Sequence, residues 1–201
     1  MQHIRPKTTE WFTYFPEDYR WSAAIGGMLG LAVVGASDMG EIDRTARKLK
    51  NKLGDDEAWF FTWQELGDEL KQKADNCRNR GHTISDSVFY LRASCYYQWG
   101  ERFRTVKDDH ALNVYRKSVE CFHEHAQLSI SPKIEIVEVP YEGNFLPGYF
   151  VHAENTKKSK NPTMIFFDGL DITKELQYAR GVPELINCLL YTSPSPRDLS
   201  T

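Results

Sequence analysis

The stretch TMIFFDGLD, from Thr163 to Asp171, decides the fold class. Residues 163–167 are a short apolar run, which is typical of a strand covered on both faces of a sheet. The run leads directly into Asp168-Gly169-Leu170-Asp171, and a helix-compatible segment begins at Ile172. A strand followed by a loop and a helix is typical of α/β proteins. The sequence therefore predicts a buried strand over residues 163–167 that leads into a helix.

The loop formed by Gly169, Leu170 and Asp171 has two interpretations. Glycine lets the backbone approach a substrate closely and the next helix adds a positive dipole, so the backbone N–H groups could stabilise an oxyanion. The loop could equally be a plain strand-to-helix turn, with Asp171 as the helix cap and Glu175 in the first turn. The residues alone leave both interpretations open.

A second β segment precedes this strand. Lys133–Val139 alternates β-branched with polar residues, and Phe145–Ala153 is an extended run rich in Tyr, Phe and Val. The intervening Tyr141-Glu142-Gly143-Asn144 is typical of a turn. We predict an antiparallel hairpin here, followed by a polar loop over 154–162.

The region from Glu17 to Leu128 has a helical pattern that fits five helices. Trp21–Ser37 carries no charge, but it is too short and too glycine-rich to span a bilayer, which takes about 20 apolar residues. We interpret it as a buried helix. A second helix is predicted from about Glu41 to Gly54, after Asp38.

Three amphipathic helices follow. The third, between Asp55 and Gly81, is the clearest, because steps of three and four residues give it one apolar face: Trp59, Trp63, Leu66, Leu70, Ala74 and Cys77. The fourth should be capped by Thr83 or Ser85, and its predicted face holds Ile84, Val88, Leu91 and Cys95. The fifth begins after Asp109, and its predicted face holds Leu112, Tyr115, Val119, Phe122 and Ala126.

Composition excludes several classes of protein. Of 201 residues 41% are hydrophobic and 26% charged, as in ordinary globular proteins. The net charge of -3 gives no positive field for nucleic acid or a membrane surface, and the basic residues between Arg44 and Lys52 fit a solvated helix face. The four cysteines form no C-x-x-C pair, and no apolar leader follows Met1, which favours a cytoplasmic protein.

Cys121, His123 and His125 suggest a metal site at first sight. Helical positions two apart point in different directions, so these side chains do not converge on one ion. We predict surface histidines and no metal site.

The last residues break every pattern. Residues 188–201 resemble a translated sequencing-library adapter, which would place the end of the natural sequence near Asn187. A disordered Pro/Ser tail is the alternative that composition allows. In either case we expect 188–201 to lie outside the folded core.

Short motifs spread over residues 21–187 resemble one family of α/β-hydrolases. It includes 2,6-dihydroxypseudooxynicotine hydrolase, the fungal polyketide-shortening hydrolases and the fermentation-respiration switch esterases. The motifs are, in chain order, Gly40-Glu41-Ile42, Glu57-Ala58-Trp59 with Trp63, Gly81-His82 with Ser85, Tyr90-Leu91-Arg92-Ala93 with Tyr96-Tyr97, Gly169-Leu170-Asp171 and Thr173-Lys174-Glu175. Their order and spacing carry the resemblance, since no single motif is specific.

The resemblance implies a helical cap, residues 1–130, and the start of an α/β-hydrolase core, residues 131–187. It implies hydrolysis of a small-molecule carbonyl compound, an ester or a carbon–carbon bond next to a ketone, by a serine nucleophile with a histidine base and an acidic partner. Gly169, Leu170 and Asp171 match the family's oxyanion segment, which supplies one of two donors. No metal or organic cofactor is implied, and relatives suggest a homodimer.

Aromatic residues on the predicted cap helices are candidates for substrate binding: Trp59, Trp63, Tyr96 and Tyr97. A cap must supply apolar walls that exclude water from the reacting bond. Packing in the core is the plain alternative for each of them.

The sequence departs from the family pattern because it contains no G-x-S-x-G nucleophile motif. The nearest match, Gly35 to Gly40, has the wrong spacing and no strand before it. The nucleophile, the acid and the catalytic histidine are therefore expected outside the residues present, and the chain is predicted to be an inactive fragment of a hydrolase. A non-enzymatic helical interaction module is the alternative, and a grooved, exposed apolar face on the helices would favour it.

Overall fold

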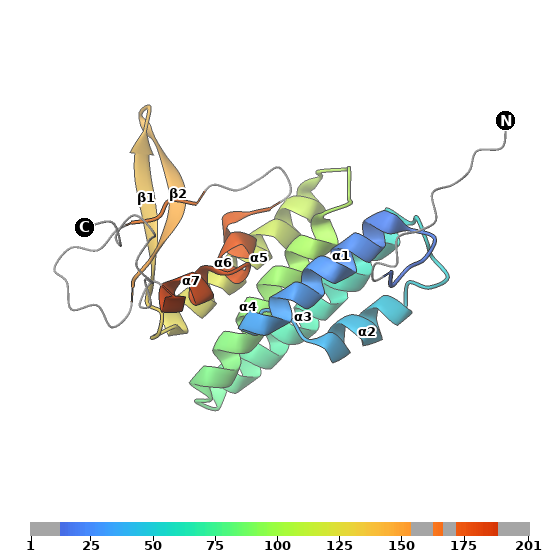
Figure 1. Ribbon diagram of the computed structural model, residues 1–201, viewed down its shortest axis with the longest axis horizontal. Helices are drawn as coiled ribbons and strands as arrows, with labels where there is room; N and C mark the ends of the chain where they lie inside the picture. Colours follow the sequence, from blue (N-terminus) through green and yellow to red (C-terminus); the bar gives the residue numbers. More distant parts are fainter. Residues whose placement is uncertain (1–12, 154–162, 167–171, 189–201) are drawn as a thin grey trace, which may run out of the picture.

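The computed structural model describes residues 13–153, 163–166 and 172–188. Its elements are, in order, α1 (Tyr19–Gly30), a 3-10 turn η1 (Leu31–Val34), α2 (Met39–Arg47), α3 (Asp56–Asn79), α4 (Thr83–Glu101), α5 (Asp109–Leu128), β1 (Ile134–Tyr141), β2 (Asn144–Val151), α6 (Lys174–Ala179) and α7 (Val182–Cys188). Figure 1 shows α1 to α5 as one helical body, with the hairpin β1–β2 standing at one end and α6 and α7 beside α5.

Aspartates set the starts of most long helices. The carboxylates of Asp18, Asp38, Asp55 and Asp108 each accept a hydrogen bond from a backbone N–H of the following first turn. These bonds satisfy donors that a helix start otherwise leaves unpaired. Helix α4 is the exception, because His82 occupies its cap position without a side-chain hydrogen bond. The predicted cap at Thr83 or Ser85 is therefore wrong.

Helix α3 lies at the centre of the helical body and buries the predicted apolar face. Trp59, Trp63 and Leu70 have no exposed surface, whereas Cys77 at the end of the face is only partly buried. The backbones of α3 and α4 approach closely at Gly67, where an added Cβ would lie 2.5 Å from the Tyr97 ring. Helix α1 joins this core through Trp21, whose ring centroid lies 4.9 Å from that of Trp59.

The apolar faces predicted for α4 and α5 are partly wrong. Ile84 is 82% exposed, and Leu112 and Tyr115 are also exposed. On α5 the buried face includes Ser118 and His125 instead. The physical reason is that these polar side chains are hydrogen-bonded to α4, so they can be buried at little cost and rotate the helix away from its apolar stripe.

Helix α2 is shorter than expected. It ends at Arg47, and turns lead to Gly54, which has a left-handed φ of 79°. Helix α1 also ends early, at Gly30, where the chain tightens into η1. The buried character predicted for this region is confirmed, since Trp21, Ile25 and Met28 have no exposed surface. No helix in the described part of the chain is long and apolar enough to cross a membrane.

The hairpin has the predicted strands and turn. Strands β1 and β2 pair antiparallel, with Ile134 opposite Val151 and Tyr141 opposite Asn144. The turn residues Glu142 and Gly143 both have positive φ, 45° and 77°. A two-residue turn of this conformation matches the twist of the strands it joins. Only the base of the hairpin packs against the helices, whereas its distal residues are exposed.

The strand predicted over 163–167 is not formed by the described residues of that segment. Residues 163–166 have no strand pairing and are exposed, Ile165 by 72%. A central strand needs a partner on each side, but the described sheet contains β1 and β2 alone. Helix α6 follows as expected, although its cap is Thr173 and not the predicted Asp171. The described architecture is thus a body of helices, α1 to α5, followed by a two-stranded antiparallel hairpin and two short helices.

Candidate substrate pocket

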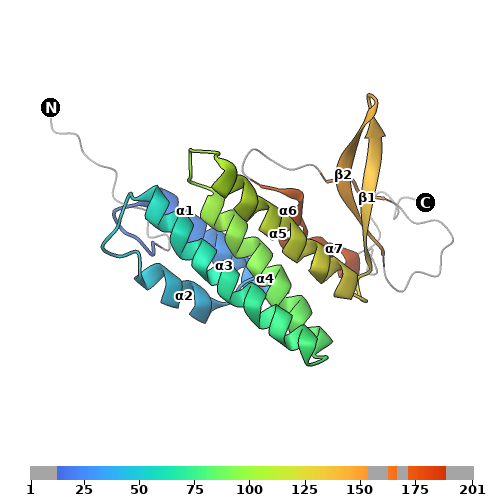
Figure 2. The same cartoon turned by 180° about the vertical axis from the view of Figure 1, so that it is seen from behind.

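A cavity of about 230 Å³ lies where the end of α4 meets the start of α6. Helices α4, α5 and α6 lie side by side at this place in the views from both sides (Figure 2). The lining residues are Gln98, Trp99, Glu101, Arg102, Lys107, Tyr115, Ile172, Thr173 and Leu176. The wall thus combines two aromatic rings and two aliphatic side chains with several polar groups. Such a mixture is typical of a site that encloses a small molecule and fixes its orientation.

Thr173 joins the two sides of the pocket. Its hydroxyl accepts a hydrogen bond from the Leu176 N–H, capping α6, and donates one to the Gln98 side-chain carbonyl. The Gln98 amide in turn donates to Ser118 Oγ on α5 at 2.7 Å. This chain of hydrogen bonds fixes the first residue of the α6 wall relative to α4 and α5.

Charged side chains stand at the α4 end of the pocket. The Arg102 guanidinium lies 5.2 Å from the Trp99 ring centroid, and Lys107 forms an ion pair with Glu101. Burial lowers the pKa of Lys107. These two cations and one carboxylate give this side of the pocket an excess of positive charge.

The predicted substrate-binding residues Trp59, Trp63, Tyr96 and Tyr97 are not among the residues that line this pocket. All four are fully buried in the helical core. Two of them also form hydrogen bonds within the helical body: the Trp59 indole donates to the Trp99 carbonyl at 2.9 Å, and the Tyr97 hydroxyl donates to Asp68 at 2.7 Å. A role for them in substrate binding stays a prediction.

Trp99 is the pocket aromatic that the sequence did not indicate. It is 7% exposed, and its benzene ring fits against Gly27 of α1, where an added Cβ would lie 2.5 Å away. The signal in the sequence is weak, because Trp99 follows three residues, Tyr96 to Gln98, that are themselves buried. What separates Trp99 from an ordinary core residue is its position near the C-terminal end of α4, which is capped by Arg102.

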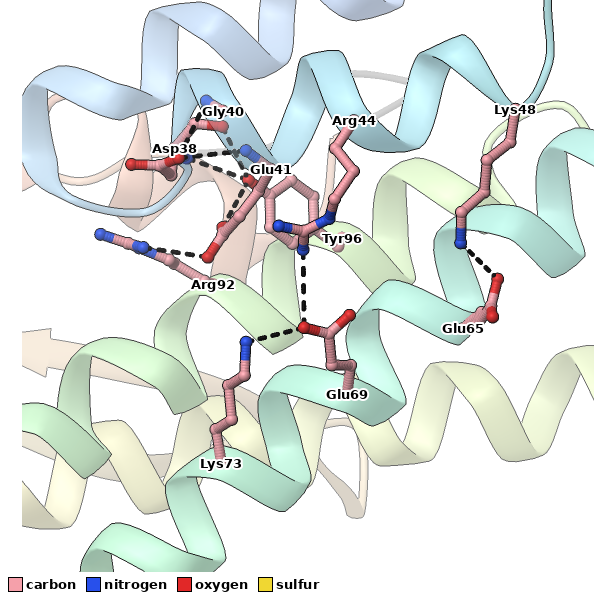
Figure 3. A network of polar contacts seen from close by, with 10 residues as sticks. All are labelled: Asp38, Gly40, Glu41, Arg44, Lys48, Glu65, Glu69, Lys73, Arg92 and Tyr96. Atoms are coloured by element: carbon pink, nitrogen blue, oxygen red, sulfur yellow. Dashed lines mark hydrogen bonds and ion pairs between the residues drawn. The ribbon is translucent and has the colours of Figure 1, made fainter.

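Two of the motifs that carry the family resemblance meet in one polar network (Figure 3). Glu41 of α2 accepts hydrogen bonds from Arg92 at 3.1 Å and from the Tyr96 hydroxyl at 3.0 Å. The Tyr96 oxygen also accepts the Asp38 backbone N–H at 2.9 Å. Burial, together with the Glu41 charge, raises the pKa of Tyr96. The network fixes α2 on α4, so the role it gives these motif residues is structural.

The basic side chains of this region are exposed, as predicted for a solvated helix face, and some of them also form ion pairs. Figure 3 shows two of them turned toward acidic side chains of α3. Arg44 pairs with Glu69 at 3.5 Å, and Lys48 with Glu65 at 2.9 Å. Exposed pairs such as these contribute about 0–1 kcal/mol each, so they add little to the packing of α2 on α3.

The histidines of α5 differ from the prediction of surface positions. His125 is 8% exposed, and His123 is partly buried. Burial lowers the pKa of His125 to about 4. Among the described residues, no group of three or more His, Cys, Asp or Glu side chains could hold a metal ion.

The expected oxyanion residues Gly169, Leu170 and Asp171 lie outside the described residues. The next residue in the chain, Ile172, lines the pocket, as do Thr173 and Leu176. The sequence therefore places the expected oxyanion segment directly before one wall of the pocket.

Three curated relatives are named as a hydrolase, an alpha/beta hydrolase and a hydrolyase. Hydrolase acrC of Aspergillus aculeatus is 27% identical over 184 residues, 85% of this chain and 42% of that protein. Alpha/beta hydrolase psoB of Aspergillus fumigatus is 26% identical over 75% of this chain and 35% of its own length. Hydrolyase poxO of Penicillium oxalicum is 26% identical over 79% of this chain and 38% of its own length. The chain thus spans less than half of the length of each.

No family model matches the chain. The crystal structure of 2,6-dihydroxy-pseudo-oxynicotine hydrolase is similar to it with a TM-score of 0.48 and 21% identity, over 60% of this chain and 32% of that one. The curated relatives confirm the resemblance indicated by the sequence motifs: this chain is similar to hydrolases of the α/β-hydrolase type.

Proposed function

We propose that this chain supplies the cap and one pocket wall of a serine-type α/β-hydrolase. The substrate is a small carbonyl compound, cleaved either at an ester or at a carbon–carbon bond next to a ketone. The 201 residues contain no G-x-S-x-G motif, so by themselves they lack the nucleophile and are inactive. The proposed setting is cytoplasmic, with a homodimer as the assembly.

The position of the pocket is the observation that carries this proposal. One wall comes from the helical cap through Gln98, Trp99 and Tyr115, and the other from residues that directly follow Gly169-Leu170-Asp171 in the chain. The expected oxyanion segment therefore directly precedes this second wall in the chain. Oxyanion stabilisation requires a backbone N–H donor beside an enclosed substrate.

The chemistry divides between this chain and the rest of the enzyme. A serine hydroxyl attacks the carbonyl carbon and a histidine accepts its proton; the tetrahedral intermediate then expels the leaving group, which takes that proton from the histidine, as an acyl-enzyme forms. Water then releases the acid. The residues of this chain enclose the substrate between Trp99 and Leu176, exclude bulk water from the reacting bond and supply one oxyanion donor.

The alternative of a helical interaction module requires an exposed apolar groove on the helices. Their most exposed apolar side chains lie on separate elements, Tyr19 on α1, Val33 on η1 and Ile84 on α4. That distribution does not favour a single docking groove.

A pocket-filling substitution tests the proposal in the longer protein read from the same gene past residue 187. Ile172→Trp should reduce kcat/KM for small esters or β-diketones by about tenfold or more, because the ring occupies the cavity. Val33→Trp is the matched control, since Val33 is 80% exposed and far from the pocket residues in sequence. Equal activity of both variants and the parent would contradict the proposed pocket, and hydrolysis by the 201-residue chain alone would contradict its inactivity.

A further inference from the structure

Helix α6 begins with a buried carboxylate. Glu175 is 1% exposed, yet it lies in the first turn of a short helix at the edge of the helical body. Its Oε1 accepts a hydrogen bond from the Tyr149 hydroxyl at 2.7 Å and lies 2.8 Å from Lys174 Nζ. Among the described residues, its Oε2 has no hydrogen-bond partner. A buried carboxylate is costly unless such donors hold it.

The hydrogen bonds at Tyr149 have a defined direction. The hydroxyl has one hydrogen, and the Glu175 carboxylate can only accept, so Tyr149 donates to Glu175. His123 Nε2 lies 3.1 Å from the same hydroxyl oxygen, which is then left as the acceptor. His123 therefore carries its hydrogen on Nε2. The result is a directed chain from His123 through Tyr149 to Glu175.

The groups around these three hydrogen-bonded residues favour an ionised Glu175. Burial opposes the charge, but hydrogen bonds from Lys174 and Tyr149 outweigh it and lower the pKa of Glu175. Burial lowers the pKa of His123, and burial beside the Glu175 charge raises that of Tyr149. Tyr149 thus keeps its proton, which is the donor that Glu175 needs.

The hydrogen bonds from His123 through Tyr149 to Glu175 connect three elements that are distant in sequence. His123 belongs to α5, Tyr149 to β2 and Glu175 to α6. The Tyr149 ring also packs on Phe122, with centroids 4.6 Å apart, and lies under Lys174 Nζ at 5.4 Å. Tyr149 is the common contact, so it couples the base of the hairpin and α5 to the first turn of α6.

That first turn is also the pocket wall. Thr173 and Leu176, on either side of Glu175, line the cavity. We propose that His123, Tyr149 and Glu175 form a positioning network that holds the α6 wall of the pocket, with Tyr149 as its central residue. The link to catalysis rests on the proposed function, whereas the network itself does not.

Hydrogen exchange in the 201-residue chain tests the network directly. Tyr149→Phe removes one hydroxyl and keeps the ring packing, so amides of α6 should exchange about tenfold faster at pH 7, while those of α3 are unchanged. Tyr141→Phe is the matched control, because Tyr141 is on the same hairpin and 55% exposed. Unchanged α6 exchange in Tyr149→Phe would overturn the network.

Kinetics in the longer protein test its consequence for catalysis. Active sites are first counted with a fluorophosphonate probe, so that misfolded protein does not enter the rate. Tyr149→Phe should lower kcat per labelled site about tenfold with KM little changed, because the expected oxyanion segment directly precedes the α6 wall in the chain and its donor acts only in the transition state. Faster exchange with an unchanged kcat per site would overturn the positioning role. A parent protein without any labelled site would instead refute the proposed function.

Discussion

The stability of the helical body depends on the protonation state of one buried residue, His125. Its Nδ1 lies 3.0 Å from the Ser87 hydroxyl oxygen and 3.1 Å from the Ser87 carbonyl oxygen. Its Nε2 is buried without a hydrogen-bond partner among the described residues. Protonation would place a charge and an unpaired N–H in the core between α4 and α5. The neutral ring is therefore part of the folded state.

Stability should consequently fall on acidification. The folded-state pKa of His125 is about 4, below its usual 6.5, so between these values the unfolded chain binds more protons than the folded one. The contribution is complete above pH 6.5 and is lost as the pH falls toward 4, by up to about 3 kcal/mol. Urea unfolding measured from pH 7 to pH 4.5 should show this slope.

Substitution identifies the residue responsible. His125→Asn keeps a donor near the Nδ1 position and removes the titration, so its free energy of unfolding should depend less on pH across this range. His110→Asn, at an exposed histidine of the same helix, should keep the parent slope. If His125→Asn retains the full slope, His125 is not the titrating group.

The sequence could predict the role of a residue where that role depends on neighbours close in the chain. The aspartate caps at Asp38 and Asp55 were predictable, because a cap bonds to its own helix. The burial of His125 was not, since it depends on Ser87, 38 residues away in the chain. The same applies to the pocket, where Thr173 and Gln98 meet only through the packing of α6 on α4.

At the scale of elements, the α3–α4 contact depends on a glycine in mid-helix. Gly67 costs helix stability relative to alanine, but it lets the Tyr97 ring approach the α3 backbone. The closeness of the two helices therefore takes precedence over helix propensity at this position. Gly26 of α1 offers the opposite case, since nothing lies within 4 Å of its added Cβ.

These two glycines form a matched pair for mutation. Gly67→Ala should destabilise the protein by about 2 kcal/mol, because the methyl group overlaps a rigid buried ring. Gly26→Ala should stabilise it by about 0.5–1 kcal/mol through helix propensity alone. Chemical denaturation of both variants measures the difference, and a stabilised Gly67→Ala would show that Tyr97 can move away from α3.

The elements that could be predicted best are those whose conformation depends on their own residues and not on distant contacts. The hairpin follows from its own turn, because Glu142 and Gly143 adopt positive φ and fix the register. Residues 163–166 have a strand's composition but lack neighbouring strands among the described residues, so their propensity is not realised. Helix α5 was predictable as a helix but not in its orientation, because Ser118 and His125 are buried by hydrogen bonds.

At the scale of the whole molecule, the helical body is well packed whereas the β part is open. Phe145 is 61% exposed and Leu146 51%, and residues 163–166 add further exposed apolar surface. An unpaired hairpin edge with apolar side chains is a site of self-association. The chain should therefore associate as its concentration rises.

A charge on the hairpin should reduce this association. Phe145→Lys is expected to shift sedimentation-velocity profiles toward the monomer at the same concentration. Ile84→Lys, at an exposed position of α4, should leave the profile unchanged. Equal effects of both substitutions would mean that association follows net charge and not the hairpin.

We propose that this chain forms the cap and a pocket wall of a serine hydrolase whose nucleophile lies outside its residues. Intact mass spectrometry after reaction with a fluorophosphonate probe tests it most directly. The longer protein should gain one phosphonyl group, on a serine outside residues 1–187, and the 201-residue chain should gain none. A longer protein that stays unlabelled while folded, or a label on a serine within residues 1–187, would contradict the account.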